Sequence, residues 1–117
     1  MDARSEIRRR AAAGLKVGDR FCVSRTFTDA EVASFARLTG DYNPVHSDAE
    51  FARLKGFPRT ICHGLLAGAL ITEIGGQIGW LATRMSFEVL RPVFTGDAVV
   101  CTMTITSIDA RGFAVAE

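Results

Sequence analysis

The stretch from Gly64 to Gly79 is the feature that most limits how this chain can fold. It is predicted to be a helix that is apolar on nearly every side, interrupted by Glu73 and Gln77. A helix without a polar face must be enclosed by protein, and its polar interruptions and glycines favour a buried core helix over a membrane span. Because 117 residues suit one domain, the enclosure has to come from elsewhere in the same chain or from a second copy.

Apolar and polar residues alternate after this helix, with the period of a β-strand. Residues 85–90 predict one strand, and Val99–Thr106, which is rich in β-branched residues, predicts a longer one. Asp109–Gly112 is a turn signal, so we expect a hairpin whose second strand begins at Phe113. A sheet curled around one hydrophobic helix accounts for both the apolar helix and the alternating strands that follow it. The predicted fold class is therefore α+β, with an antiparallel sheet wrapped around a long central helix.

The first half of the chain has clear helix boundaries. Alternation over Arg20–Phe27 predicts a strand, and Thr28–Glu31 is a capping box that predicts a helix after it. Gly40 is well placed to end that helix in the left-handed conformation. A second capping box at 47–50 predicts a short helix that runs to about Leu54. The polar segment 40–47 is thus a loop between two capped helices.

Composition excludes several classes of protein. The formal net charge of +1 provides no field that would attract nucleic acid or an anionic membrane. The three cysteines are odd in number and widely spaced, which argues against a disulfide framework and favours a reduced, cytoplasmic location. The charged first residues lack the apolar region of a signal peptide. We expect residues 1–16 to be a flexible arm and residues 17–117 to be the folded domain.

Asp41 and His46 are the candidate catalytic residues of the loop, on either side of Pro44. Proline forbids continuation of the helix and stiffens the loop. A carboxylate and an imidazole held in this way can share one water molecule, and histidine exchanges protons readily near neutral pH. Each residue alone is more often structural, with the aspartate capping a turn and the histidine bonding to a backbone carbonyl.

His63 and Gly64 precede the apolar helix, where backbone N–H groups have no intrahelical partner. The Gly64 amide is a candidate oxyanion donor, and glycine lets a ligand approach closely. Nothing in the sequence activates Cys62 as a nucleophile, so we expect it to be inert. Asp41, His46, Asp48 and His63 match no familiar spacing of metal ligands, and no metal is expected.

Three stretches of this sequence resemble the MaoC-like (R)-specific enoyl-CoA hydratases and dehydratases. The most specific is Gly40-Asp41-Tyr42-Asn43-Pro44-Val45-His46, which is similar to the core of the hydratase 2 motif of that family. Supporting similarity lies at residues 61–66 and 91–97, and the resemblance covers about 17–117. It implies a hot-dog fold, an antiparallel sheet wrapped around a long helix, in a homodimer.

The resemblance also implies roles for individual residues. Asp41 and His46 match the pair that activates water, and Gly64 matches the glycine whose amide binds the oxyanion. Thr72 matches a supporting hydroxyl residue, which is typically a serine in the family. Asn43, more often a turn residue, His63 and Thr72 are the candidate substrate-binding residues, and the Asn43 amide is placed to orient Asp41. The substrate class is an acyl thioester of coenzyme A or of acyl carrier protein, with no cofactor, nucleic acid or membrane involved.

The predicted function is reversible hydration of a trans-2-enoyl thioester to a (3R)-3-hydroxyacyl thioester. Two alternatives stay open, a hot-dog acyl-CoA thioesterase and a non-catalytic accessory subunit that binds acyl thioesters. The sheet of the family continues beyond the strand that begins near Phe113, whereas this sequence ends at Glu117. We therefore expect the domain to lack its last strand or strands, so that either the sequence is a fragment or a partner completes the sheet.

Overall fold

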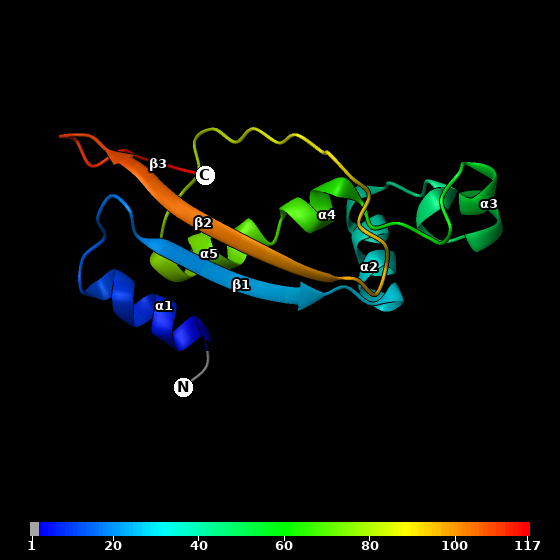
Figure 1. Cartoon of the computed structure of the whole chain (residues 1–117), viewed down its shortest axis with the longest axis horizontal. Coiled ribbons are helices and arrows are strands. Elements are labelled where there is room, and N and C mark those ends of the chain that lie inside the picture. The colour runs from blue at the N-terminus through cyan, green and yellow to red at the C-terminus, as the bar shows by residue number, and fades with distance from the viewer. Residues whose placement is uncertain (1–2) are drawn as a thin grey trace. The chain divides into compact units, whose positions relative to one another are not determined.

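A computed structural model describes residues 3–117, which form two compact units. The first unit contains the residues up to Ser24 together with 70–85 and 100–117, and the second contains 25–69 and 86–99. One three-stranded sheet has the order β1-β2-β3, formed by Arg20–Thr26, Ala98–Ile108 and Ala114–Ala116 (Figure 1). The strand over 20–26 and the long strand at 99–106 agree with the alternation of the sequence.

The first unit is built around three fully buried side chains. Phe21 lies on β1, Ile105 on β2 and Ile74 on helix α5 (Ile71–Ile78), and each is at most 1% exposed. Strands β2 and β3 pair antiparallel in the expected hairpin, with Ile108 opposite Ala114. The turn between them is held by the Asp109 carboxylate, which accepts the N–H groups of Arg111 and Phe113.

The N-terminal segment differs from the flexible arm that we expected. Residues Ala3–Ala12 form helix α1, which packs against α5. The Ile7 side chain is buried, and the Arg10 guanidinium lies 4.3 Å from the centre of the Phe21 ring and donates to the Arg20 carbonyl. Packing against α5, the buried Ile7 and the stacked Arg10 hold a segment whose sequence resembles a charged, unpatterned tail. Residues 1–2 lie outside the described part.

Helix α2 (Asp29–Thr39) of the second unit begins and ends as its sequence predicts. The Thr28 Oγ1 atom accepts the N–H of Glu31, the Glu31 carboxylate accepts the N–H of Thr28, and Gly40 closes the helix at a φ of 79°. The Thr28 N–H, followed by the Arg25 guanidinium, holds the pKa of the Glu31 carboxyl below its ordinary value. The capping box is confirmed.

Replacing Thr28 with alanine tests this cap. We expect the free energy of unfolding to fall by about 0.5–2 kcal/mol, because the N–H of Glu31 loses its acceptor. Thr28→Ser is the matched control, since serine can form the same box. Urea denaturation followed by circular dichroism measures both variants, and equal stability of the alanine and serine proteins would contradict the assignment.

The short helix after the loop starts differently from the prediction. Helix α3 (Ala49–Leu54) is capped by Asp48, whose Oδ1 atom accepts the N–H groups of Glu50 and Phe51. The box that we expected to begin at Ser47 does not form. A single 3-10 turn, η1 (Pro44–His46), precedes it and moves the helix start by one residue.

The apolar stretch 64–79 is divided into α4 (Gly64–Gly68) and α5, whereas we predicted one helix. Ala69 and Leu70, which interrupt it, keep right-handed backbone angles. Glycine has a low helix propensity, which weakens the ladder where α4 ends at Gly68. The expected enclosure holds for Ile74 on α5 but not for α4, where Leu65 is exposed. Among the helices described, none is both long and apolar enough to cross a membrane.

Residues 85–90, which we predicted to be a strand, are extended but unpaired within residues 3–117. Alternate side chains of this segment, Phe87 and Val89, nevertheless pack against α4. A Cβ atom on Gly68 would lie 3.1 Å from the Phe87 ring, and one on Gly64 would lie 3.4 Å from Val89 Cγ2. A strand requires a neighbouring backbone as well as an alternating pattern, and the described part of the chain supplies none here.

Candidate active site

The loop after α2 is held by hydrogen bonds at every second residue. The Thr39 hydroxyl donates to the Phe35 carbonyl at 2.8 Å and accepts the Asp41 N–H at 3.3 Å. Asp41 Oδ1 accepts the Asn43 N–H, and Asn43 Oδ1 accepts the Val45 N–H, both at 3.2 Å. Short polar side chains that bond to the backbone two residues on are typical of tight turns. The series gives the exposed loop a defined path before any ligand binds.

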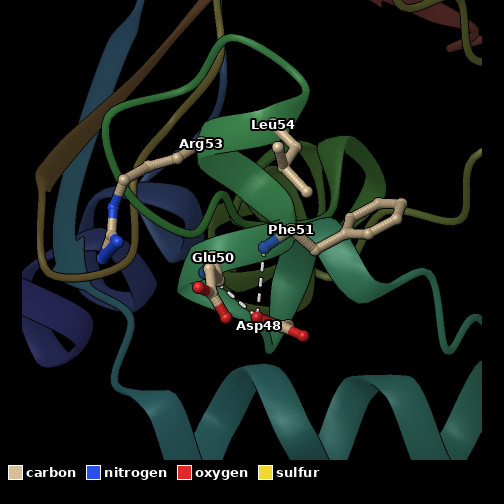
Figure 2. Close-up of a pocket in the computed structure, with 5 residues that line it drawn as sticks. All are labelled: Asp48, Glu50, Phe51, Arg53 and Leu54. Carbon is tan, nitrogen blue, oxygen red and sulfur yellow. Dashed lines mark hydrogen bonds between the residues drawn. The ribbon is translucent and has the colours of Figure 1, made fainter.

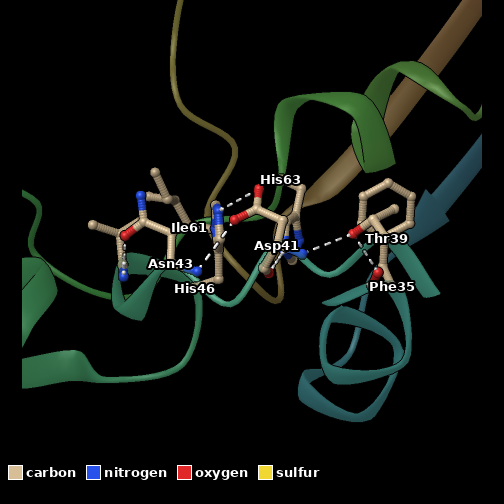
Figure 3. Close-up of polar contacts among 8 residues, drawn as sticks. Phe35, Thr39, Asp41, Asn43, His46, Ile61 and His63 are labelled. Atoms are coloured by element: carbon tan, nitrogen blue, oxygen red, sulfur yellow. Dashed lines mark hydrogen bonds and ion pairs between the residues drawn. The ribbon is translucent and has the colours of Figure 1, made fainter. Parts of the chain in front are cut away.

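Asp41 and His46 face each other across this loop (Figure 3). The distance from Asp41 Oδ2 to His46 Nε2 is 3.8 Å, and the aspartate side chain is 51% exposed while the histidine side chain is 10% exposed. The opposite nitrogen of the ring, Nδ1, bonds to the Ile61 carbonyl oxygen at 2.7 Å. Because a carbonyl only accepts, Nδ1 carries the proton, and in the neutral ring Nε2 presents its lone pair to the carboxylate.

Ile61 ties the 3-10 turn to the rest of the second unit. Its N–H donates to the Val45 carbonyl while its own carbonyl accepts from His46. The neighbouring Cys62 N–H donates to the Val93 carbonyl at 2.7 Å, and Ile61 forms an isolated antiparallel bridge with Phe94. The His46 ring therefore rests on a backbone that is itself held from two sides.

His63 contacts both Asp41 and His46. Its side chain is buried, its Nε2 atom donates to the Asp41 carbonyl at 3.1 Å, and its ring stacks on His46 with centroids 3.7 Å apart. The Nδ1 atom is buried and has no hydrogen-bond partner among the described residues. We expected His63 to pack and bond locally or to bind substrate, but its hydrogen bond reaches a residue 22 positions away.

Gly64 is the first residue of α4 and is exposed. Within residues 3–117 its N–H donates no hydrogen bond, whereas the N–H groups of Leu66 and Ala67 both reach the His63 carbonyl. The His63 side chain does not cap the helix either. The Gly64 N–H is therefore available to an acceptor from outside the chain, as an oxyanion donor requires.

The other predicted substrate-binding residues lie in different places. Asn43 is a turn residue, because its side chain caps η1, and Asp41 is oriented by the Asn43 backbone N–H rather than by the side-chain amide. Thr72 lies on α5, in the first unit, whereas the loop belongs to the second. Its supporting role remains a prediction.

Cys62 has the environment of an inert thiol. It is buried with Phe27 and Val32 in the apolar core of the second unit. Burial raises the pKa of the Cys62 thiol above its ordinary value, which outweighs the lowering by the hydrogen bond with Thr95. A protonated thiol is a poor nucleophile, so the structure favours the inert role.

One group of described residues has ligand atoms close enough together to be considered for a metal ion. It contains Asp41, His46 and His63, with these atoms within 4.8 Å of one another, and Asp48, which caps α3, is not a member. The planes of the His46 and His63 rings are only 26° from parallel. Imidazole lone pairs lie in the ring plane, so those of stacked rings run side by side and do not converge on one ion. The arrangement does not fit a shared metal.

An open hollow lies against α3, and neither histidine is among its lining residues (Figure 2). It is lined by Asp48, Glu50, Phe51, Arg53 and Leu54. Asp48 is occupied by its capping bonds to Glu50 and Phe51, and the Leu54 side chain is exposed. The hollow contains neither of the two histidines and neither Asp41 nor Gly64.

Three supporting residues were not identified from the sequence. Thr39 could have been found, because a threonine two residues before an aspartate is a common turn signal. Phe35, whose ring packs at 4.9 Å and 60° against His63, resembles an ordinary core residue of a helix. Ile61 contributes through its backbone, which carries no sequence signal.

Comparisons of sequence point to one family. The family model described as "MaoC like domain" matches residues 14–116. The chain is 38% identical to the (R)-specific enoyl-CoA hydratase of Aeromonas caviae over 104 aligned residues. The alignment covers 84% of this chain and 76% of that protein. It is 63% identical over 86 residues to the peroxisomal enoyl-CoA hydratase 2 of Arabidopsis thaliana, and this alignment covers 69% of this chain and 28% of that protein. The chain thus spans less than a third of this second relative.

Comparisons of structure agree. The solved (R)-hydratase of A. caviae, described as involved in PHA biosynthesis, matches with a TM-score of 0.72 and 32% identity over 88% of this chain and 92% of that one. An R-hydratase of Pseudomonas aeruginosa in the unliganded form matches with a TM-score of 0.70 and 28% identity over 89% and 78%. These matches confirm the α+β class and the hot-dog fold.

Proposed function

Because this chain belongs to the family of MaoC-like domains, we propose that it interconverts trans-2-enoyl thioesters and (3R)-3-hydroxyacyl thioesters as a hydro-lyase. The observation that carries the proposal is the pair of proton acceptors, Asp41 Oδ2 and His46 Nε2, 3.8 Å apart. Two acceptors at this spacing suit a water molecule that donates one hydrogen to each of them.

The geometry accounts for attack on the β-carbon. A water molecule that donates both hydrogens directs its lone pairs away from Asp41 and His46, toward an incoming double bond. The water oxygen bonds to Cβ, one proton passes to the pair, and a proton returns from the pair to Cα, so that one water is added overall. General acid–base catalysis of this kind contributes about 10²–10⁴-fold, and the loop provides it by holding both groups in place beforehand.

Gly64 supplies the second requirement of the reaction. Addition at Cβ places negative charge on the thioester oxygen, as an enolate, before Cα is protonated. A free backbone N–H that points at this oxygen stabilises the charge, an effect of about 3 kcal/mol in comparable sites. The Gly64 N–H is free in the described structure and belongs to the residue that follows His63. No redox cofactor or metal takes part in these steps.

The substrate that suits this chemistry is an acyl thioester of coenzyme A or of acyl carrier protein. The A. caviae relative is named for enoyl-CoA, and a relative from Arabidopsis, 32% identical over 88 residues, is a mitochondrial 3-hydroxyacyl-[acyl-carrier-protein] dehydratase. The two carriers present the same thioester and differ only beyond it. Asp41, His46 and Gly64 act on the shared part.

Crotonyl-CoA distinguishes this function from its alternatives. We expect the enoyl absorbance to decrease when the protein is added, because hydration removes the conjugated double bond, and we expect no free thiol. A thioesterase would release free coenzyme A, which a thiol reagent detects, and an accessory subunit would change neither signal. Release of thiol without hydration, or no reaction at all, would contradict the proposal.

We propose that the working form is a homodimer in a reduced, cytoplasmic compartment. All three cysteines are free, which suits such a compartment. Large apolar side chains are exposed on the second unit, including Leu65, Phe87 and Leu90. Apolar surface of this kind is often covered by a partner. Light scattering at increasing protein concentration tests the dimer, and a monomer at all concentrations would contradict it.

A further inference from the structure

His63 has an unusual set of contacts for a residue at the start of a helix. It occupies the N-cap position of α4, yet its side chain makes no capping bond. The ring is 3% exposed, and its one hydrogen bond within the described structure runs from Nε2 to the Asp41 carbonyl. Because that carbonyl only accepts, Nε2 carries the proton, which leaves the buried Nδ1 atom as an unpaired acceptor in the neutral ring.

The ring is held between two aromatic neighbours. On one side it stacks on His46, with centroids 3.7 Å apart and planes 26° from parallel, and on the other it packs at 60° against Phe35 of α2. His63 therefore contacts both members of the proposed acid–base pair, one through a hydrogen bond and the other through its face (Figure 3).

His63 provides the long-range anchor of Asp41 and a second one for His46, whose Nδ1 atom also bonds to the Ile61 carbonyl. The other backbone and carboxylate hydrogen bonds of Asp41 reach Thr39 and Asn43, which lie within two residues of it. Its side chain is half exposed, so little else restrains it. An unpaired buried nitrogen destabilises a fold. The buried position of His63 is thus better explained by its contacts with Asp41 and His46 than by a contribution of the ring to stability.

We propose that His63 is a positioning residue that sets the separation between the Asp41 carboxylate and His46 Nε2. This inference rests on the proposed hydratase function and assigns His63 a role other than substrate binding. The hydrogen bond fixes the start of the loop, and the ring face fixes the plane of the His46 imidazole. A displacement of about 1 Å in such a pair is enough to lower a rate by about 10²-fold.

Two variants separate the two contacts. His63→Gln retains an N–H donor near the position of Nε2 but removes the ring, and His63→Phe retains the ring but removes the donor. We expect both to lower kcat for crotonyl-CoA by about 10- to 100-fold with KM nearly unchanged. A rise in KM with unchanged kcat would show instead that His63 binds substrate, and it would overturn the proposal.

A double-variant comparison shows whether His63 acts through Asp41. In the Asp41→Asn background, His63→Phe should lower kcat by less than threefold, because the group that it positions has already been lost. A purely structural role would instead give the same fractional loss in both backgrounds. Equal losses would therefore overturn the proposal, provided that circular dichroism shows all four proteins to be folded.

Histidine resonances test the same contact without an activity assay. The chain has only two histidines, and both are in this cluster. In protein labelled with ¹⁵N-histidine, we expect one ring protonated on Nδ1 and the other on Nε2. In His63→Gln the remaining His46 resonances should shift and broaden, and unchanged resonances would overturn the proposal. If crotonyl-CoA is not hydrated at all, the proposed function fails while this measurement still decides the positioning role.

Discussion

Replacing Asp41 with asparagine is expected to lower kcat for hydration of crotonyl-CoA by about 10²–10⁴-fold, with the fold retained. The amide has almost the same shape as the carboxylate and can still accept the Asn43 N–H. It cannot accept a proton from water. The enoyl absorbance of crotonyl-CoA, followed at saturating substrate, measures the loss directly.

Asp48→Asn is the matched control for this prediction. Asp48 lies just after the loop 40–47 and undergoes the same chemical change, but its carboxylate caps α3, a position that asparagine fills equally well. The control should hydrate crotonyl-CoA at the wild-type rate. If Asp41→Asn is as active as Asp48→Asn, the carboxylate has no part in the reaction.

His46 should behave as part of the same unit. His46→Ala is expected to be about as inactive as Asp41→Asn, and the double variant should be little worse than either. In the proposed mechanism both groups hold one water molecule across their 3.8 Å separation, so loss of either one already disorders it. Losses that multiply would show that Asp41 and His46 act independently.

Replacing Gly64 with proline is expected to lower kcat by about 10²–10³-fold, because proline lacks the N–H that would stabilise the enolate. The backbone accepts this change. Gly64 is the first residue of α4, where proline is favoured. The preceding His63, at φ −59° and ψ 136°, is in the polyproline II region rather than the α region that proline disfavours in the residue before it.

Gly64→Ala is the comparison for the proline variant, since alanine adds a Cβ atom but retains the N–H. That atom would lie 3.4 Å from Val89 Cγ2, an ordinary contact, so we expect a stable protein. The alanine variant should retain at least tenfold more activity than the proline variant. Equal activity of the two would show that the amide hydrogen does not act on the substrate.

Local signals predicted much of the fold. The capping box at Thr28, the left-handed Gly40 and the turn at Asp109 depend on contacts within four residues, and the structure has all three. Two of the predictions that failed depended on distant partners. Residues 85–90 have the alternation of a strand but no neighbouring backbone, and α1 is ordered by α5 and Phe21, which no local pattern reveals.

The candidate site divides in the same way. Asp41 and His46 were predicted because Pro44 keeps them in one short loop, and the structure brings them face to face. The tautomer of His46 depends on the carbonyl of Ile61, 15 residues away. The role of His63 depends on contacts that no spacing in the sequence encodes.

The sequence by itself determined the polar loop 40–47, its residue types and the family to which the chain belongs, because these are set by side-chain chemistry over a few consecutive residues. Only the tertiary structure decided which nitrogen of each histidine carries a proton and what holds Asp41 beside His46. The physical reason is that hydrogen bonds to backbone carbonyls and the stacking of rings form between segments that are brought together by folding. No pattern in the sequence predicts these contacts.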